Sequence, residues 1–253
     1  MRSTRSRRGV RGRRLAVGLA AVALLAAGCL EDAPTSTKAP ITPPATSAPT
    51  STAEPLRAEA TERHARDVTL RVRNLGCGGI ATGSAVAIGE GLLVTNRHVI
   101  EGADRLEVTT WDGRTLTVDV AQAAMTHDIA VAAVDGVLPD AARVAADDPA
   151  VGAEVLVAGY PGGGALRIDE GSVVDHTDDV LFGAEAGALE LDVGVAPGSS
   201  GGPVLDPSGA VVGVIYALAA PSGHGLAVPV SALREALDAG DALVGIPDCP
   251  TPP

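Results

Sequence analysis

The chain has 253 residues, of which 46% are hydrophobic but only four are Phe, Trp or Tyr, and its formal net charge at pH 7 is −12. Seven arginines and no acidic residue lie within the first 28 residues, so a chain without that segment carries about −19. Such a charge repels nucleic-acid phosphates. No Cys/His cluster has metal-ligand spacing, and no glycine-rich loop opens a helix as phosphate binding requires. We therefore expect no nucleic-acid partner, no metal and no cofactor.

Residues 1–28 have the organisation of an export signal. A basic segment precedes the apolar run Leu15–Ala27, which is too short for a typical membrane span. The small residues before Cys29 resemble the lipobox of bacterial lipoproteins, although Ala26 stands where leucine is preferred. This resemblance implies that Cys29 is lipidated and holds the protein at the outer face of the cell membrane. The alternative is an ordinary secretory signal with Cys29 incidental. The Arg7-Arg8 pair leaves the route open between Sec and twin-arginine export.

Residues 29–66 are predicted to form a disordered tether. From Asp32 to Pro55 the chain is rich in Pro, Thr, Ser and Ala, and it has almost no large apolar residue to bury. Arg57–Arg66 is compatible with a short, solvated helix that leads into the first strand. The folded domain is then expected over residues 67–253.

Short runs of Val, Leu and Ile recur between Gly, Pro and Asp turns without interleaved helices, which is typical of an antiparallel barrel or sandwich. Asp112-Gly113 is a favourable hairpin turn. One amphipathic helix is predicted at Ser231–Ala239, with Ser231 as its N-cap and Gly240 just past its end. The core must be packed mainly with Val, Leu, Ile and Ala. The expected strands are Val68–Val72, Ser84–Ile88, Leu92–Thr95, Arg105–Thr110, Thr115–Val120, Ile129–Val134, Glu154–Ala158, Gly171–Val174, Leu189–Val193, Val204–Asp206, Val211–Tyr216 and Gly225–Val228.

The segment from Pro197 to Val204 places serine inside a glycine-rich turn between two short hydrophobic runs. Glycine permits backbone conformations that a side chain forbids, and it lets a substrate carbonyl approach backbone N–H groups. A hydroxyl nucleophile with an oxyanion hole requires this arrangement. Taken alone, the pattern also fits a plain glycine-rich turn.

Two further segments support a nucleophilic serine. His98 follows the apolar run Leu92–Thr95, and Asp128 stands at the start of the apolar run Ile129–Val134. A histidine, an aspartate and a serine, in that order and each at a strand end, are the parts of a hydroxyl-nucleophile triad. Hydrolases with a nucleophile elbow have the order Ser, Asp, His instead.

Five motifs resemble, in order, those of the bacterial HtrA-type branch of trypsin-like serine proteases with the chymotrypsin fold. The likeness spans roughly residues 80 to 237 and implies two six-stranded antiparallel β-barrels followed by a C-terminal helix. The length after the tether leaves no room for the PDZ module that often follows in this branch. The Gly159–Gly164 stretch and the flanking cysteines resemble, more loosely, the membrane-anchored periplasmic acid-resistance proteases of actinobacteria. The five motifs are Gly83–Val86, Val94–Val99, Asp128–Val131, Asp192–Leu205 and Gly225–Pro229.

The resemblance assigns roles to the candidate residues. Ser200 is the nucleophile, His98 takes its proton and passes it to the leaving amine, and Asp128 orients the imidazole. The backbone N–H groups of Gly198 and Ser200 form the oxyanion hole. Ser199 is the competing nucleophile, but the G-x-S-G-G frame favours Ser200.

The other histidines receive no role. His127 adjoins the predicted triad aspartate but should point to the opposite side of a strand-like stretch, so it is predicted at the surface. His64, His176 and His224 lack a motif context and are expected to be exposed.

The substrate pocket is implied by the resemblance only. Gly194 would lie near the floor of the primary pocket, and Tyr216 and Leu218 would border the substrate. Gly194 carries no charge, so a preference for Lys or Arg is not supported. We expect a small or medium apolar residue at the cleaved position.

Three cysteines become two if Cys29 carries lipid. Cys77 and Cys249 then bracket the folded domain, and export permits a disulfide between them. The alternative is two free buried thiols.

Together these features predict an exported serine endopeptidase that acts on proteins or peptides and meets the membrane through its lipid anchor. Two alternatives remain open. One is a catalytically degenerate, lipid-anchored binding module of the same fold, and the other is an esterase that uses the same residues.

Overall fold

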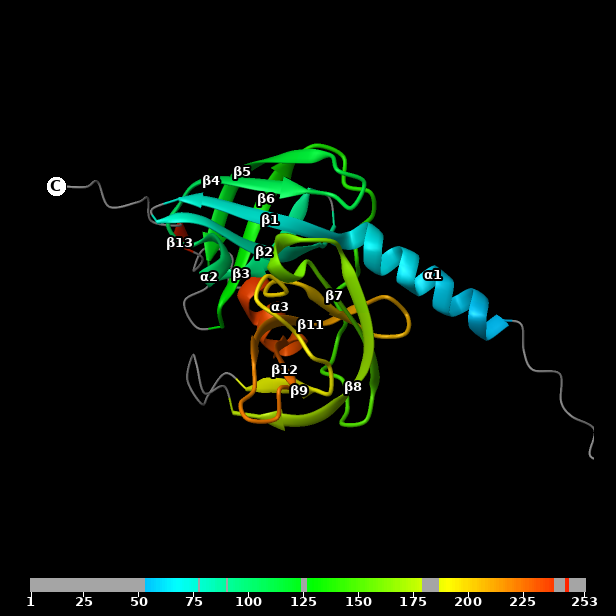
Figure 1. Ribbon diagram of the computed structural model, residues 1–253. Coiled ribbons are helices and arrows are strands. Elements are labelled where there is room, and N and C mark those ends of the chain that lie inside the picture. Colours follow the sequence, from blue (N-terminus) through cyan, green and yellow to red (C-terminus); the bar gives the residue numbers. More distant parts are fainter. Residues whose placement is uncertain are drawn as a thin grey trace, which may run out of the picture. The chain divides into compact units, whose positions relative to one another are not determined.

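Two closed antiparallel barrels follow one another along the chain (Figure 1). The computed structural model describes residues 53–76, 78–89, 91–123, 127–178, 187–238 and 244–245. The strands of the first barrel are β1 (Thr69–Gly76), β2 (Gly79–Ala87), β3 (Leu92–Asn96), β4 (Ala103–Thr109), β5 (Thr115–Ala123) and β6 (Ile129–Asp135). Their order is β5-β4-β1-β2-β3-β6, and a β5–β6 pairing closes the ring. The short strand β13 (Val244–Gly245) adds to β5.

The second barrel is also closed, in the order β10-β11-β12-β9-β8-β7. The predicted fold class, all-β with two six-stranded antiparallel barrels and a C-terminal helix, is therefore confirmed. The strands of this barrel are β7 (Glu154–Gly159), β8 (Arg167–Thr177), β9 (Ala188–Leu191), β10 (Pro203–Leu205), β11 (Val211–Leu218) and β12 (Gly225–Pro229). Helix α2 (Arg97–Ile100), the 3-10 turn η1 (Pro161–Gly163) and helix α3 (Val230–Asp238) complete the two barrels.

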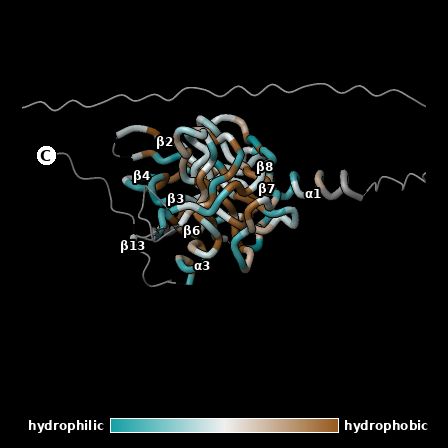
Figure 2. The backbone as a smooth tube through the Cα atoms, turned by 90° about the horizontal axis from the view of Figure 1, so that it is seen from below, coloured by the Kyte–Doolittle hydropathy of each residue, from teal (hydrophilic) through white to brown (hydrophobic). Residues whose placement is uncertain are grey.

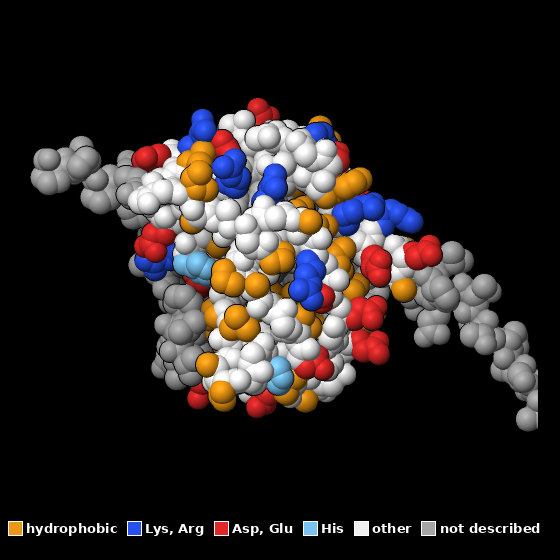
Figure 3. Space-filling view, viewed as in Figure 1, with side chains coloured by type: hydrophobic (Ala, Val, Ile, Leu, Met, Phe, Trp, Pro, Cys, Tyr) orange, Lys and Arg blue, Asp and Glu red, His pale blue; other side chains and the backbone are white. Residues whose placement is uncertain are grey.

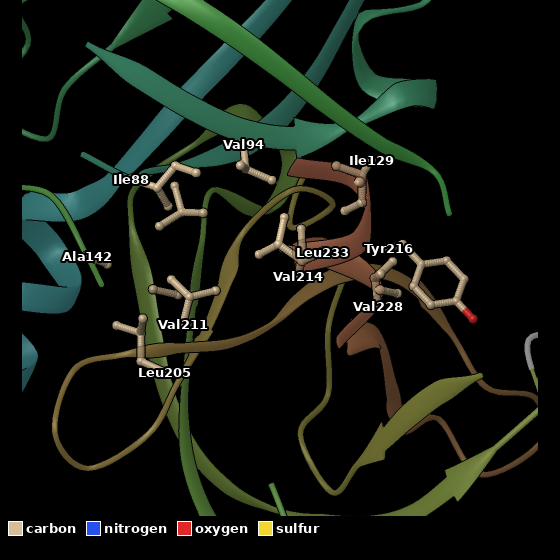
Figure 4. Close-up of a cluster of buried hydrophobic side chains, with 14 of the residues drawn as sticks. Ile88, Val94, Ile129, Ala142, Leu205, Val211, Val214, Tyr216, Val228 and Leu233 are labelled. Atoms are coloured by element: carbon tan, nitrogen blue, oxygen red, sulfur yellow. The ribbon is translucent and has the colours of Figure 1, made fainter. Parts of the chain in front are cut away.

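Three clusters of aliphatic side chains form the core, as the shortage of aromatic residues requires. One fills the first barrel around Leu70, Leu93 and Ile100, and a second fills the other barrel around Leu189 and Leu191. Figure 2 shows the hydrophobic segments gathered inside the molecule. The third cluster lies between the barrels, where the outer faces of β2, β3 and β6 meet those of β10, β11 and β12 (Figure 4). It holds the two barrels together, and the site described below lies along the same junction.

Helix α1 (Ala53–Val68) leads into β1. It includes the predicted helix Arg57–Arg66 but begins earlier, so residues 53–66 are helical rather than the end of a disordered tether. Ala65 and Val68 are fully buried in the cluster between the barrels. Burial of this face supplies the stability that a short, polar helix lacks by itself. None of the helices in the described ranges is long and apolar enough to cross a membrane.

Polar side chains fasten the end of α1. Nδ1 of His64 lies 2.6 Å from the Asp140 carboxylate, and Nε2 lies 3.2 Å from the carbonyl oxygen of Gly209. The Arg66 guanidinium lies 4.2 Å from the centroid of the Trp111 ring, within the range of a cation–π contact. His64 is therefore partly buried, and its predicted exposure is wrong.

Helix α3 covers the junction and differs from the prediction at its start. It begins at Val230, so Ser231 lies in its first turn and is not the N-cap. The Asp148 carboxylate caps this end instead, since it accepts hydrogen bonds from the Ser231 N–H at 2.9 Å and from the hydroxyl at 2.7 Å. The predicted helix end at Ala239 and Gly240 lies outside the described residues.

Candidate active site

His98 and Asp128 meet because two neighbouring strands end at the same edge. Strands β3 and β6 pair with Asn96 opposite Ile129, so the residues after β3 lie beside the residue before β6. The ring Nδ1 of His98 lies 2.7 Å from Oδ2 of Asp128, and the His98 backbone N–H donates to Oδ1 at 3.0 Å. The Asp128 carbonyl accepts from the Arg97 N–H at 2.9 Å. The predicted partnership between the two side chains is present in the structure.

Asp128 is buried and conformationally unusual. Its side chain is 1% exposed, and its backbone φ is +52°, the only positive φ at a non-glycine residue in the described chain. Aspartate tolerates the left-handed region better than most residues do. The amide of Asn96 donates to the Asp128 carbonyl at 3.2 Å and holds this conformation. The side chain of His98, by contrast, is 42% exposed.

Ser200 approaches this pair from the second barrel. A Cβ at Gly83 would lie 2.4 Å from Val99, the neighbour of His98, and 3.2 Å from the carbonyl oxygen of Ser200. The turn that carries Ser200 and helix α2 therefore lie against the same point of β2. The Ser200 hydroxyl donates to the carbonyl oxygen of Tyr216 at 3.3 Å. No hydrogen bond joins it to Nε2 of His98 among the described residues.

The turn that carries Ser200 depends on glycine at two positions. Gly198 and Gly201 have φ values of +98° and +86°. A Cβ at Gly201 would lie 2.0 Å from the backbone oxygen of Ser84. The turn leaves two N–H groups available, because in the described chain neither Gly198 N nor Ser200 N donates to a protein acceptor. Two unpaired N–H groups beside a serine hydroxyl can bind an oxyanion.

The predicted pocket residues do not all lie together. Gly194, Val195 and Ala196 line a small pocket with residues of β7 and β8, and a Cβ at Gly194 would meet open space. Tyr216 and Leu218 lie on β11 and do not line that pocket. Tyr216 is buried in the cluster between the barrels, whereas Leu218 is 45% exposed.

Two further histidines differ from the prediction. His127 is only 8% exposed, and its Nε2 lies 3.5 Å from the Glu235 carboxylate on α3. Its predicted surface position is therefore wrong, because α3 packs over the segment before β6. His224 is partly buried, with Nδ1 2.7 Å from the Glu190 carboxylate. His176 is exposed as predicted.

Other predicted features fall elsewhere. Cys29, Cys77 and Cys249 lie outside the described residues. Within the described ranges, no group of three or more His, Cys, Asp or Glu side chains could hold a metal ion.

Burial raises the pKa of Tyr160, whose hydroxyl donates to the carbonyl oxygen of Thr69 at 3.4 Å.

The sequence reasoning gave no role to Ser84, although it belongs to one of the quoted motifs. Its side chain is fully buried and binds the turn that carries Ser200. A polar residue beside the apolar Ala85 and Val86 was the available signal.

Comparisons with known proteins agree with this geometry. Residues 83–214 match the model of the trypsin-like peptidase domain family. A protein described as a probable periplasmic serine endoprotease, DegP-like, from Brucella suis biovar 1 is 32% identical over 167 residues, which are 63% of this chain and 33% of that protein. The chloroplastic protease Do-like 1 of Arabidopsis thaliana is 32% identical over 161 residues, which are 59% of this chain and 36% of the relative. The chain thus spans about a third of the length of these curated relatives.

Solved structures give the same fold. The active form of the Rv3671c protease from M. tuberculosis has a TM-score of 0.65 at 24% identity, covering 78% of this chain and 88% of that one. The HtrA-type protease AlgW with a tripeptide has a TM-score of 0.64 at 27% identity, covering 74% of this chain and 62% of its own. The two barrels, the residues at their junction and the family match lead to one conclusion: the chain belongs to the trypsin-like peptidase domain family.

Proposed function

We propose that this protein is an exported serine endopeptidase that works through Ser200, His98 and Asp128. The observation that carries the proposal is the buried Asp128 carboxylate, bound to both the ring and the backbone of His98, at the edge of the barrel that faces the Ser200 turn. A buried carboxylate in this position selects the tautomer that leaves Nε2 of His98 free to accept a proton, and it stabilises the imidazolium that then forms.

The chemistry follows from these positions. His98 Nε2 takes the Ser200 proton as Oγ attacks the scissile carbonyl, and the N–H groups of Gly198 and Ser200 bind the oxyanion. His98 returns the proton to the leaving amine, which departs and leaves an acyl-enzyme. Water then attacks the acyl group, His98 takes the water proton, and the carboxylic acid leaves as the Ser200 hydroxyl re-forms. No cofactor enters any step.

One observation favours the binding-module alternative. The Ser200 hydroxyl donates to the Tyr216 carbonyl and not to His98. Rotation about the Cα–Cβ bond of Ser200 redirects this hydroxyl, and catalytic hydrogen bonds are often absent before substrate binds. Reactivity of Ser200 with a probe therefore distinguishes a peptidase from a binding module.

A fluorophosphonate probe tests the proposal on the purified protein. Wild type should be labelled, Ser200→Ala should not, and Ser199→Ala should be labelled nearly as well as wild type, because its side chain serves no step. Asp128→Asn should lower kcat by about 10⁴, because the asparagine amide favours the wrong tautomer of the imidazole. Labelling that is lost in Ser199→Ala but kept in Ser200→Ala would identify Ser199 as the nucleophile. A wild type that never labels would favour the binding module.

We also propose that the protein is exported and is anchored through Cys29. The periplasmic location in the description of the DegP-like relatives supports export. Cys29→Ala should move the protein from the membrane fraction to a soluble exported form, and unchanged membrane association would contradict the anchor. A disulfide between Cys77 and Cys249 is proposed for the exported domain. Intact mass after alkylation without reductant should show no modified thiol.

For specificity, we propose a small or medium apolar residue at the cleaved position. The uncharged Gly194 and the apolar Val195 and Ala196 beside it support this preference. Arg167 and Asp169 also line the pocket, and their charges are paired with each other at 2.8 Å. A library of tetrapeptide substrates that varies only the cleaved residue measures it, and a preference for Lys, Arg, Asp or Glu would contradict it.

A further inference from the structure

We propose that Ser84 is a positioning residue for the oxyanion hole, through its hydrogen bond to the Gly198 carbonyl. The inference rests on the proposed function, since it concerns how the N–H groups of Gly198 and Ser200 are held for catalysis. Ser84 touches no reacting atom. It acts on the backbone that carries the two donors.

Ser84 lies where the barrels come closest. It belongs to β2 of the first barrel, opposite Arg71 of β1, and it is 0% exposed. Its backbone N–H donates to the carbonyl oxygen of Ser200 at 2.7 Å, across the junction. Its own carbonyl accepts from the Thr95 hydroxyl at 2.6 Å, which ties this point of β2 to β3. The residue is therefore fixed in the first barrel while its polar atoms reach the second.

The side-chain hydroxyl of Ser84 binds two backbone groups of the second barrel. Oγ donates to the Gly198 carbonyl at 2.8 Å and accepts from the Tyr160 N–H at 2.9 Å. The Tyr160 N–H can only donate and the Gly198 carbonyl can only accept, so the single hydroxyl proton must point at Gly198. Both contacts are buried, where a polar group left without a partner is strongly unfavourable.

The neighbouring peptide groups of the turn are held by backbone partners. The Pro197 carbonyl accepts from Gly162 N at 2.7 Å, and the Ser199 carbonyl accepts from Gly202 N at 2.9 Å. Because a peptide group is planar, each bond fixes the direction of the next N–H along the chain. These two bonds therefore orient the N–H groups of Gly198 and Ser200.

The peptide between those two groups is held on one side by a residue of the other barrel. It joins Gly198 to Ser199; its N–H donates to the Ala196 carbonyl at 2.9 Å, and its carbonyl accepts from the Ser84 hydroxyl. Among the described residues, Ser84 is the only one whose side chain binds a carbonyl from Pro197 to Ser200. Gly198 has φ +98° and no Cβ to restrict it. Without the Ser84 hydroxyl only the bond from the Ser199 N–H to Ala196 holds this peptide, and a tilt of its carbonyl shifts the Gly198 and Ser200 N–H groups away from a common point.

The test compares Ser84→Ala with Thr69→Val in the purified, exported protein. Thr69 is a matched control, because it is equally buried and its hydroxyl donates to the Ala65 carbonyl at 2.6 Å, away from the nucleophile turn. The probes are a fluorophosphonate, succinyl-Ala-Ala-Pro-Val p-nitroanilide, the matching valine aldehyde and the product acid. The aldehyde forms a tetrahedral adduct whose oxygen occupies the oxyanion hole, whereas the product acid reports ordinary binding.

Ser84→Ala should lower kcat and the affinity for the aldehyde together, by about 10-fold to 100-fold, since removal of a whole oxyanion donor costs about 10²–10³ in kcat. KM and product affinity should stay within about twofold of wild type, and Thr69→Val should match wild type in every assay. If Ser84→Ala does not fold, Ser84→Cys provides the comparison. Because its S–H group is a weak donor, Ser84→Cys should lose less kcat and less aldehyde affinity than Ser84→Ala, and its product affinity should again stay near that of wild type.

The outcomes separate the two proposals. An active wild type with an unaffected, folded Ser84→Ala overturns the role of Ser84 alone. Equal losses of aldehyde and product affinity, or equal losses in Thr69→Val, also overturn it, because they indicate general destabilisation. A wild type that reacts with no probe overturns the proposed function and the role of Ser84 with it.

Discussion

Asp128 combines burial, charge and an uncommon backbone conformation in one residue. Its φ of +52° directs the side chain back toward the backbone N–H and ring of His98, while its carbonyl binds Arg97 and Asn96. Residues in this region of φ and ψ cost of order 1–3 kcal/mol and persist only where the surroundings fix them. Here the surroundings are the ends of β3 and β6, which explains why the aspartate precedes β6 immediately.

A prediction at the same scale concerns Gly201. In Gly201→Ala the new Cβ would meet the Ser84 carbonyl at 2.0 Å and the Thr95 hydroxyl at 2.3 Å, at a φ of +86°. We expect the free energy of unfolding to fall by about 2–5 kcal/mol, from the left-handed backbone and overpacking together. Urea denaturation measures this loss.

Gly223→Ala is the matched control for that substitution. Gly223 has a similar φ of +77°, but a Cβ there meets nothing within 4 Å. Only the cost of the left-handed backbone conformation remains, so the free energy of unfolding should fall by about 1–2 kcal/mol. Equal losses at the two positions would show that the contact with Ser84 contributes nothing.

At the scale of elements, local pattern predicted the strands well because each barrel strand places apolar residues toward a core. Leu92–Thr95 and Ile129–Val134 were predicted, and with them the strand ends that hold His98 and Asp128. The predictions that are wrong, the N-cap of α3 and the exposure of His127, depend on residues that are distant in the chain. The carboxylate of Asp148 caps α3 from 83 residues away. The burial of His127 depends likewise on α3, and no local pattern reports it.

The partners of Ser84 could not be predicted for the same reason. Gly198 and Tyr160 follow it by 114 and 76 residues, and they meet it only when the barrels have closed and docked. The sequence shows the motif that contains Ser84, but it does not show which atom the Ser84 hydroxyl binds. The groups that we propose as reacting could therefore be predicted from the sequence, whereas the side chain that binds the turn around Ser200 could not.

Helix α1 gives a prediction at the scale of elements. Ala65 is fully buried against the junction, so Ala65→Asp would place an unpaired carboxylate in an apolar cluster. We expect α1 to leave the barrels and become sensitive to limited proteolysis, with a lower melting temperature. Arg63→Asp is the control, since Arg63 is exposed on the same helix and should leave both properties nearly unchanged. Equal proteolysis of the two variants would contradict the docking of α1.

At the scale of the whole molecule, the two barrels differ in charge. The described residues of the first barrel, from 69 to 136, include five arginines and seven acidic residues. Those from 137 to 238 include three arginines and thirteen acidic residues. Figure 3 shows arginine side chains over the first barrel on that face, and acidic ones over the second barrel beside β8. A substrate that meets the second barrel therefore enters a negative field.

This field gives the last prediction, which concerns residues that flank the cleaved bond and not the cleaved residue itself. Two peptides with the same apolar cleaved residue, one flanked by Lys and the other by Glu, should differ in kcat/KM at low salt by roughly tenfold, in favour of the Lys peptide. The screening length shortens from about 30 Å at 0.01 M salt to about 3 Å at 1 M, so the ratio should approach one as salt is added. A ratio that persists at high salt would indicate direct contacts with the flanking residues rather than the field of the acidic barrel.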